Sequence, residues 1–134
     1  MVIVEPDEFH NYTDENNNEI IIHKDLDARN TLITFQGKNN SVVIGEKVEI
    51  HANLDFAGDD SHIRIGNNCR FRGKILVGGG GCSVDIGDDF DCAGRVYITA
   101  AEKTKVTIGT YCRFNADIQI RTHDMHPIFD ITTN

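Results

Sequence analysis

Apolar residues recur along this chain with two nested periods, a long one of 21–22 residues and a short one of six. The long period is marked by a dipeptide that occurs at Ile44-Gly45, Ile65-Gly66, Ile86-Gly87 and Ile108-Gly109. A fixed repeat of this size is typical of a solenoid, in which each unit buries its apolar face only against its neighbours. The pattern therefore predicts a stack of similar coils.

The short period divides each coil into hexads. Steps of six residues join the apolar residues that we expect to point inward, namely Ile44, Ile50 and Phe56, then Ile65, Phe71 and Val77, then Ile86, Cys92 and Ile98, and finally Ile108, Phe114 and Ile120. The residues between them are mostly polar, charged or glycine, as expected for short β-segments that meet at sharp corners. We predict an all-β, three-sided parallel β-helix.

The predicted solenoid occupies residues 21–120, after an N-terminal flank of residues 1–20. It has about four full coils of 21–22 residues and, before them, a degenerate coil in which Ile33 and Phe35 point inward and Lys24 replaces the corner glycine. Three hexads account for only 18 residues, and the surplus is expected at one corner, within 57–62, 78–83 and 99–105.

An antiparallel sandwich is the alternative fold. It has turn signals every 8–12 residues, but no reason to keep steps of six residues in phase through three periods. Equivalent outward positions on successive coils would also place Arg95 and Asp117 together, as a solvated pair on the surface.

Charge and cysteine usage narrow the choice of partners. The net charge of -8 argues against nucleic acid or an anionic membrane as the main partner. No apolar run approaches the roughly 18 residues of a membrane-spanning helix, and no basic segment opens a signal peptide, so we expect a cytoplasmic protein.

The four cysteines form no CxxC pair, and three of them stand at apolar repeat positions, so we expect small buried side chains and no metal site.

The tandem hexads at 44–49, 65–70 and 86–91 resemble those of the hexapeptide-repeat acyltransferases. In that family such hexads form a left-handed parallel β-helix. The resemblance covers roughly residues 21–131, and it implies the left hand, whereas the general rule for parallel crossovers favours the right hand. The same coil also serves γ-class carbonic anhydrases and non-enzymatic scaffolds, so the repeat alone leaves the function open.

The sequence from Ile120 to Asp130, IRTHDMHPIFD, resembles the active-site loop of the sugar O-acetyltransferases of this family. These include maltose and galactoside acetyltransferases and enzymes that decorate bacterial surface polysaccharides, and the second group is the more similar. Their catalytic His-Pro motif maps onto His126-Pro127, in a predicted active-site-type loop at 121–134. The resemblance implies acetyl-CoA as co-substrate, a saccharide acceptor, no metal, and a homotrimer in which His126 faces a neighbouring subunit.

Acetyl transfer from a thioester to a hydroxyl needs a base that accepts the hydroxyl proton. A neutral imidazole, which titrates near about pH 6.5, suits this role, so His126 is the candidate general base. Asp124 or Asp130 could fix its tautomer, and Asn115 and His123 are further candidates for contact with the substrate. Each of these side chains also fits a plain solvated position.

Two other functions are possible on the same coil. A γ-class carbonic anhydrase needs three histidines at one metal, yet four of the six histidines lie far along the chain from His123 and His126; they are His10, His23, His51 and His62. A non-catalytic scaffold or assembly module, or a truncated inactive form, is the stronger alternative.

The chain stops at Asn134, eight residues after His126. Members of the family usually continue with further coils, which form much of the acetyl-CoA groove. We therefore expect the 134-residue chain to bind acetyl-CoA weakly or not at all. Titration calorimetry measures this directly, and a submicromolar dissociation constant would contradict the expectation.

Overall fold

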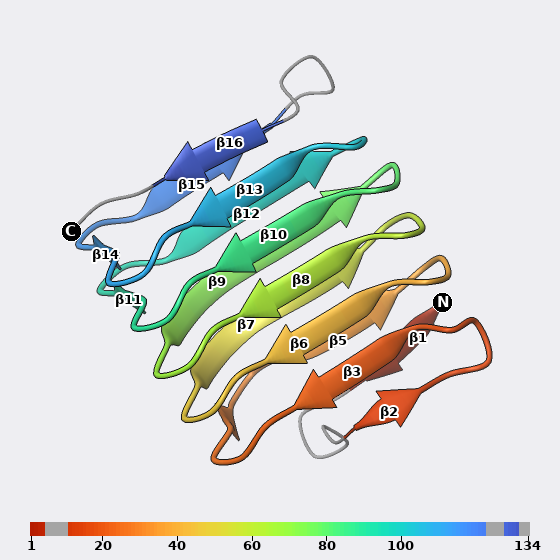
Figure 1. Ribbon diagram of the computed structural model, residues 1–134, viewed down its shortest axis with the longest axis horizontal. Helices are drawn as coiled ribbons and strands as arrows, with labels where there is room; N and C mark the ends of the chain where they lie inside the picture. Colours follow the sequence, from red (N-terminus) through yellow and green to blue (C-terminus); the bar gives the residue numbers. More distant parts are fainter. Residues whose placement is uncertain (5–10, 123–127, 132–134) are drawn as a thin grey trace.

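The protein is a β-solenoid built from strands alone. The computed structural model describes residues 1–4, 11–122 and, for the backbone, 128–131. Figure 1 shows the coils stacked side by side in chain order, from β3 near the N-terminus to β16 near the C-terminus. No helix in the described part of the chain could cross a membrane.

Each coil has three faces. The first face is a ladder of parallel strands, β3 (Glu19–Ile22), β6 (Ser41–Ile44), β8 (His62–Ile65), β10 (Ser83–Ile86), β13 (Lys105–Ile108) and β16 (Ile128–Ile131). The second face holds the short strands β4 (Asp27–Ala28), β11 (Asp91–Cys92) and β14 (Arg113–Phe114). The third face consists of β5 (Leu32–Phe35), β12 (Val96–Ala101) and β15 (Ile118–Arg121).

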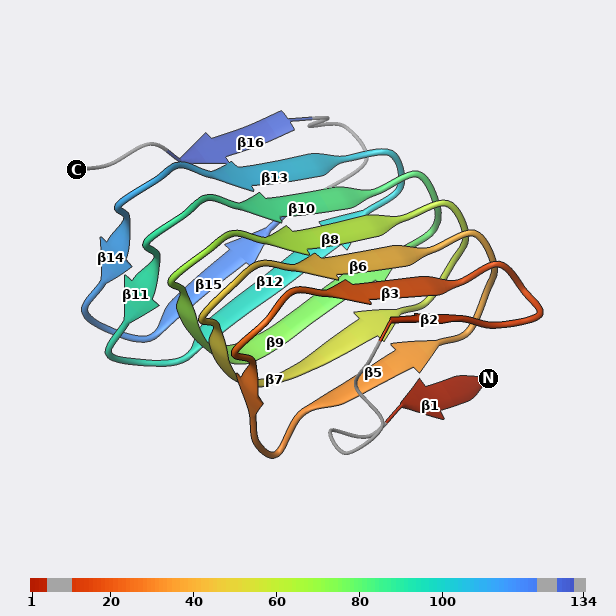
Figure 2. The ribbon, with the colours of Figure 1, turned by 60° about the horizontal axis from the view of Figure 1, so that its bottom comes forward.

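Two long strands join the second face to the third. β7 (Glu49–Phe56) and β9 (Arg70–Gly78) bend across the edge, so that their first residues pair on the second face and their last residues on the third. Figure 2 shows the resulting three-sided cross-section. The predicted three-sided parallel β-helix is confirmed.

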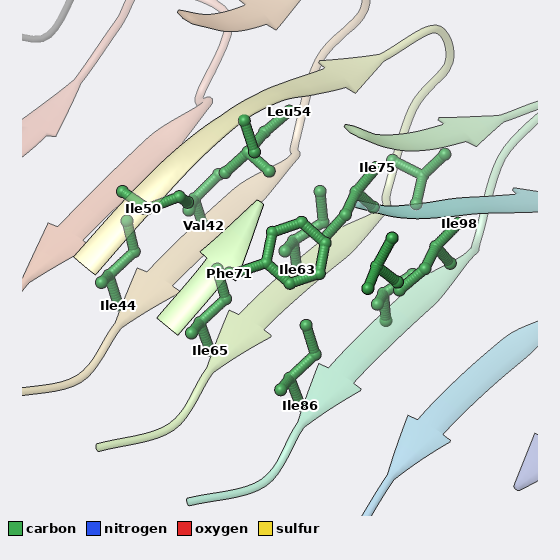
Figure 3. Close-up of a cluster of buried hydrophobic side chains, with 14 of the residues drawn as sticks. Val42, Ile44, Ile50, Leu54, Ile63, Ile65, Phe71, Ile75, Ile86 and Ile98 are labelled. Atoms are coloured by element: carbon green, nitrogen blue, oxygen red, sulfur yellow. The ribbon is translucent and has the colours of Figure 1, made fainter. Parts of the chain in front are cut away.

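The core is a set of stacked columns of identical or similar side chains. Ile44, Ile65 and Ile86 stand in direct register on β6, β8 and β10, and all three are buried (Figure 3). On the second face Phe71 and Phe90 pack with their ring centroids 6.0 Å apart. Because every coil repeats these positions, each one buries its apolar residues against the coil before and the coil after.

The Ile-Gly repeat has a steric cause at the first corner, between the first and second faces. The N–H of Glu46 donates to Asn67 Oδ1 of the next coil at 2.8 Å, and a Cβ on Gly45 would lie 2.4 Å from that same oxygen. Asn67 N–H donates in turn to Asp88 Oδ1, 2.4 Å from a Cβ on Gly66. Glycine therefore leaves the space in which the next coil caps the backbone.

The other two corners use the same arrangement. At the second corner, between the second and third faces, Arg95 N–H donates to Asp117 Oδ1 beside Gly94. At the third corner, between the third face and the first face of the next coil, Lys38 N–H donates to Asp59 Oδ1 beside Gly37. The positions of Arg95 and Asp117 on neighbouring coils are as predicted. Their contact differs, because the carboxylate accepts from the Arg95 backbone and not from its guanidinium.

The N-terminal flank closes the first edge of the solenoid. β1 (Val2–Val4) pairs antiparallel with β5, and β2 (Tyr12–Thr13) pairs antiparallel with β3. Antiparallel strands at these edges stop further parallel pairing at this end.

Two details of the predicted repeat are wrong. Ile22 pairs with Ile44, a step of 22 residues, so His23 and not Lys24 stands in place of the corner glycine. Lys24 is equivalent to Glu46 instead. The Lys24 carbonyl accepts from Lys47 N–H, and the Glu46 carbonyl accepts in the same way from Asn68 N–H, one coil later in each case.

The surplus residues also lie at two corners and not at one. Val96 pairs with Gly73 and Ile98 with Ile75, so Ala100, and not Ile98, takes the place of Val77. Four positions separate Cys92 from Val96, whereas two separate the equivalent residues Phe71 and Gly73. The second corner is therefore two residues wider in the later coils.

All four cysteines are free and buried, as predicted. Burial raises the pKa of the Cys69 thiol to about 11 and also raises that of Cys92. All four thiols thus serve as small core side chains, and those of Cys69 and Cys92 stay protonated near neutral pH.

The corner geometry predicts different costs for two glycine replacements. In Gly66→Ala the new Cβ would lie 2.4 Å from Asp88 Oδ1 and 2.8 Å from Asp88 N, and we expect a loss of about 1–3 kcal/mol in the free energy of unfolding. Gly78→Ala is the matched control, because the nearest atom to its Cβ would be 4.0 Å away and the expected change is within about 0.5 kcal/mol. Denaturant unfolding measures both, and equal losses would contradict the steric account.

Candidate functional site

The third corner of the last coil carries the residues with the predicted catalytic motif. β15 ends at Arg121, Thr122 follows, and the chain pairs again from Ile128, which stands opposite Lys105. The five residues between, 123–127, are here called the His126 segment; the corners at 57–61 and 78–82 have the same length. The segment 121–134 was predicted to be one loop, but residues 128–131 form β16 and extend the first face.

A buried threonine pair holds the start of the His126 segment. Thr122 N–H donates to Thr99 O at 2.9 Å, and Ala101 N–H donates to Thr122 Oγ1 at 3.1 Å. Thr104 Oγ1 donates to Ala101 O at 2.7 Å and also contacts Thr122 Oγ1. Both threonines are buried, so these bonds fix the point at which the segment begins.

Thr104 belongs to a column of small polar side chains and one cysteine inside the third corner. The column consists of Asn18, Asn40, Ser61, Cys82 and Thr104, all buried. Side chains in it accept from the backbone of the following coil, as in Ser61 N–H to Asn40 Oδ1 at 3.0 Å. The apolar pattern does not reveal this column, although its spacing of 21 or 22 residues repeats the period of the apolar columns.

Two adjoining hollows lie on the outside of the third corner. The first, of about 420 Å³, is lined by Leu76 and Thr99 together with the small residues Gly78, Gly79, Ala100 and Ala101, and by Glu102. The second, of about 520 Å³, shares Gly79 and Glu102 with it and adds Asp59, Asp60, Gly80, Gly81 and Lys103. Thr99 and Ala101 thus both line the first hollow and hold Thr122. The hollow is therefore fixed next to the start of the His126 segment, and its small residues leave room for a ligand along the strand ends.

The predicted site residues fall in three places. His123, Asp124 and His126 lie outside the described residues. Asp130 is on β16, where its backbone stands in register with Thr107. Asn115 is exposed at the second corner, before β15, and Thr122 follows β15 at the third corner. Within one subunit, Asn115 therefore lies at the opposite end of this strand from the start of the His126 segment.

No group of three or more His, Cys, Asp or Glu side chains among the described residues could hold a metal ion. The three histidines in the described part of the chain lie apart. His23 is at the first corner, His51 is on β7 and His62 opens β8.

The sequence is similar to that of a curated enzyme, the polysialic acid O-acetyltransferase of Neisseria meningitidis. The two are 32% identical over 124 residues, which cover 91% of this chain. The predicted resemblance to polysaccharide O-acetyltransferases is confirmed at this level, and the parallel β-helix is consistent with a hexapeptide-repeat acyltransferase.

The chain spans little more than half of that relative, since the alignment covers 57% of its length. No protein-family model matches the chain, and no solved structure matches it significantly.

The threonine pair predicts a specific loss of stability. Thr122→Val keeps the shape of the side chain but leaves the Ala101 N–H without its acceptor and removes the hydroxyl that contacts Thr104 Oγ1, and we expect a loss of about 1–3 kcal/mol in the free energy of unfolding. Thr107→Val on β13, half-buried on the outer side of its strand, is the control, with an expected change within about 0.5 kcal/mol. Equal stability of the two variants would show that the Thr122 hydroxyl does not hold the corner.

Proposed function

We propose that the protein is an O-acetyltransferase that moves an acetyl group from acetyl-CoA to a hydroxyl of a saccharide, with His126 as general base. The observation that carries the proposal is the similarity to the polysialic acid O-acetyltransferase, because it runs along 91% of the chain. It includes most of the repeat and not one short motif.

The reaction requires one proton acceptor and donors for one developing oxyanion. The acceptor hydroxyl oxygen attacks the thioester carbonyl carbon while the His126 imidazole takes the hydroxyl proton. The tetrahedral intermediate then breaks its carbon–sulfur bond, the proton returns to the sulfur, and the products are the acetyl ester and free CoA. Backbone N–H groups or a side-chain amide would stabilise the oxyanion.

The third corner supports this role for the His126 segment. Strands β12 and β15 hold the segment at its start through the bonds of Thr122. The adjoining hollow of about 420 Å³ has a floor of glycine and alanine and one larger apolar side chain, Leu76. Reactive residues on a connection held by a rigid scaffold are a frequent arrangement in enzymes.

The quaternary structure and location belong to the same proposal. We expect a homotrimer in which His126 of one subunit faces its neighbour, with the reaction in the cytoplasm where acetyl-CoA is supplied. Such an assembly would also give Asn115 a route to the acceptor that one subunit does not offer. The candidate orienting groups Asp124 and Asp130 remain proposals of the same kind.

Replacing His126 tests the proposal. In the complete protein, we expect His126→Ala to lower kcat for acetylation of a saccharide acceptor by about 10²- to 10⁴-fold, the usual contribution of a general base, with a small change in KM. His62→Ala is the control. His62 is exposed at the start of β8 and contacts Ser41 Oγ at 2.6 Å, so its loss should leave the rate unchanged. If His126→Ala keeps the full rate of acetyl transfer, His126 is not the base, and no measurable transfer by the wild type would favour the scaffold function.

A further inference from the structure

A groove of about 560 Å³ lies at the second corner, at the other end of the third face from Thr122. It is lined by His51, Arg72, Ala93, Gly94, Arg95 and Asp117. The groove exists because the corner changes width along the solenoid: β7 and β9 bend tightly through it, whereas residues 93–95 and 115–117 form wider turns (Figure 2). Arg72 therefore lies at the step from the tight corner to the wide one.

Arg72 and Arg95, both in this groove, have no carboxylate partner within the described part of the chain, and Arg121 on β15 has none there either. Ion pairs are made by Arg29, Arg64, Arg70 and Arg113. Arg72 and Arg95 make none, and the buried Nε of Arg72 has no hydrogen-bond partner. A chain with 21 acidic residues against 13 basic ones thus leaves two guanidinium groups unpaired in one hollow.

The remaining groups in the groove favour an anion as well. His51 stands in register with Arg72, one coil earlier. The only carboxylate in the lining is that of Asp117, and its Oδ1 already accepts from Arg95 N–H at 2.9 Å. The fork of an arginine matches the two oxygens of a carboxylate, and such pairs are among the stronger polar contacts in proteins.

We propose that Arg72 and Arg95 bind a carboxylate of the saccharide acceptor, and that the acceptor is an acidic polysaccharide lying across the third face. This inference rests on the proposed function, because that function requires the other end of the bound acceptor to reach His126. The groove itself is argued from the unpaired arginines alone.

The third face provides a path between the two corners. The outward residues of β12 are Tyr97, which is 38% exposed, Thr99 and Ala101. Those of β15 are Gln119 and Arg121, both exposed. Six residues of β12 span about 20 Å at roughly 3.3 Å per residue, so a ligand that reaches from Arg95 to Thr122 must contain several sugar units.

Charge also selects this path at the third corner. The hollow on the far side of that corner presents Asp59, Asp60 and Glu102 against the single Lys103, which disfavours an anionic ligand there. Arg121 lies on the third-face side, next to Thr122. An acidic chain is thus directed along β12 and β15 towards Thr122, the residue before the His126 segment.

Binding by the double variant Arg72→Gln/Arg95→Gln tests the groove. The probes are polysialic acid, polygalacturonic acid as a second polycarboxylate, and dextran as an uncharged saccharide, each titrated by calorimetry. We expect the double variant to bind the acidic probe at least about tenfold more weakly, as for the loss of charge-assisted hydrogen bonds. Arg64→Gln, in which an exposed arginine paired with Asp85 is lost from the first face, should bind like the wild type.

The same titrations made with His126→Ala separate this inference from the proposed function. His126→Ala should bind the acidic probes like the wild type, whereas arginine-dependent binding by a wild type that shows no acetyl transfer would overturn the proposed function and keep the groove. Equal binding by wild type and double variant, or no binding of either acidic probe by the wild type, would overturn the groove. A double variant that loses affinity for CoA but not for the saccharide would assign the arginines to a phosphate and also overturn it.

Discussion

The stacking of one coil on the next in parallel register is the constraint on which the whole molecule depends. Backbone hydrogen bonds run from coil to coil along every face, and no coil has a core of its own. Corners are the weak points of such a stack, because a turning backbone exposes N–H groups that no strand partner meets. Asn67, Asp88, Asp59 and Asp117 solve this problem by accepting from the preceding coil.

This solution explains why glycine and an Asn or Asp recur together. The side-chain oxygen of one coil occupies the space that a Cβ would fill in the coil before it. Gly87 is followed one coil later by Thr110 and not by an Asn or Asp, and there the backbone takes the space, since a Cβ would lie 2.8 Å from Gly109 C and 2.9 Å from Thr110 N. The corner motif is therefore a relation between two coils, although it is read in the sequence as a property of one.

Variation in corner width gives an otherwise uniform stack its distinct surfaces. Two extra residues at the second corner of the later coils produce the step that holds Arg72 and Arg95. At the third corner, the buried hydroxyl of Thr122 stands in the place of apolar side chains and anchors the chain just before the His126 segment. Both features lie on coils that share the third face, so β12 and β15 connect them physically.

The hydrophobic periods by themselves determined the coil, its three faces, the core columns and the burial of the cysteines, because an in-phase repeat of apolar residues has few ways to be buried. The residues IRTHDMHPIFD resemble the active-site loop of polysaccharide O-acetyltransferases, the class of enzyme to which the relative of this chain belongs. Only the tertiary structure decided the register at the second corner, where Val96 and Ile118 fit the apolar pattern in more than one alignment. Strand pairing selects among such alignments through backbone hydrogen bonds, which leave no mark on side-chain periodicity. The same holds for the unpaired arginines, since a charge is seen to lack a partner only when the coils are stacked.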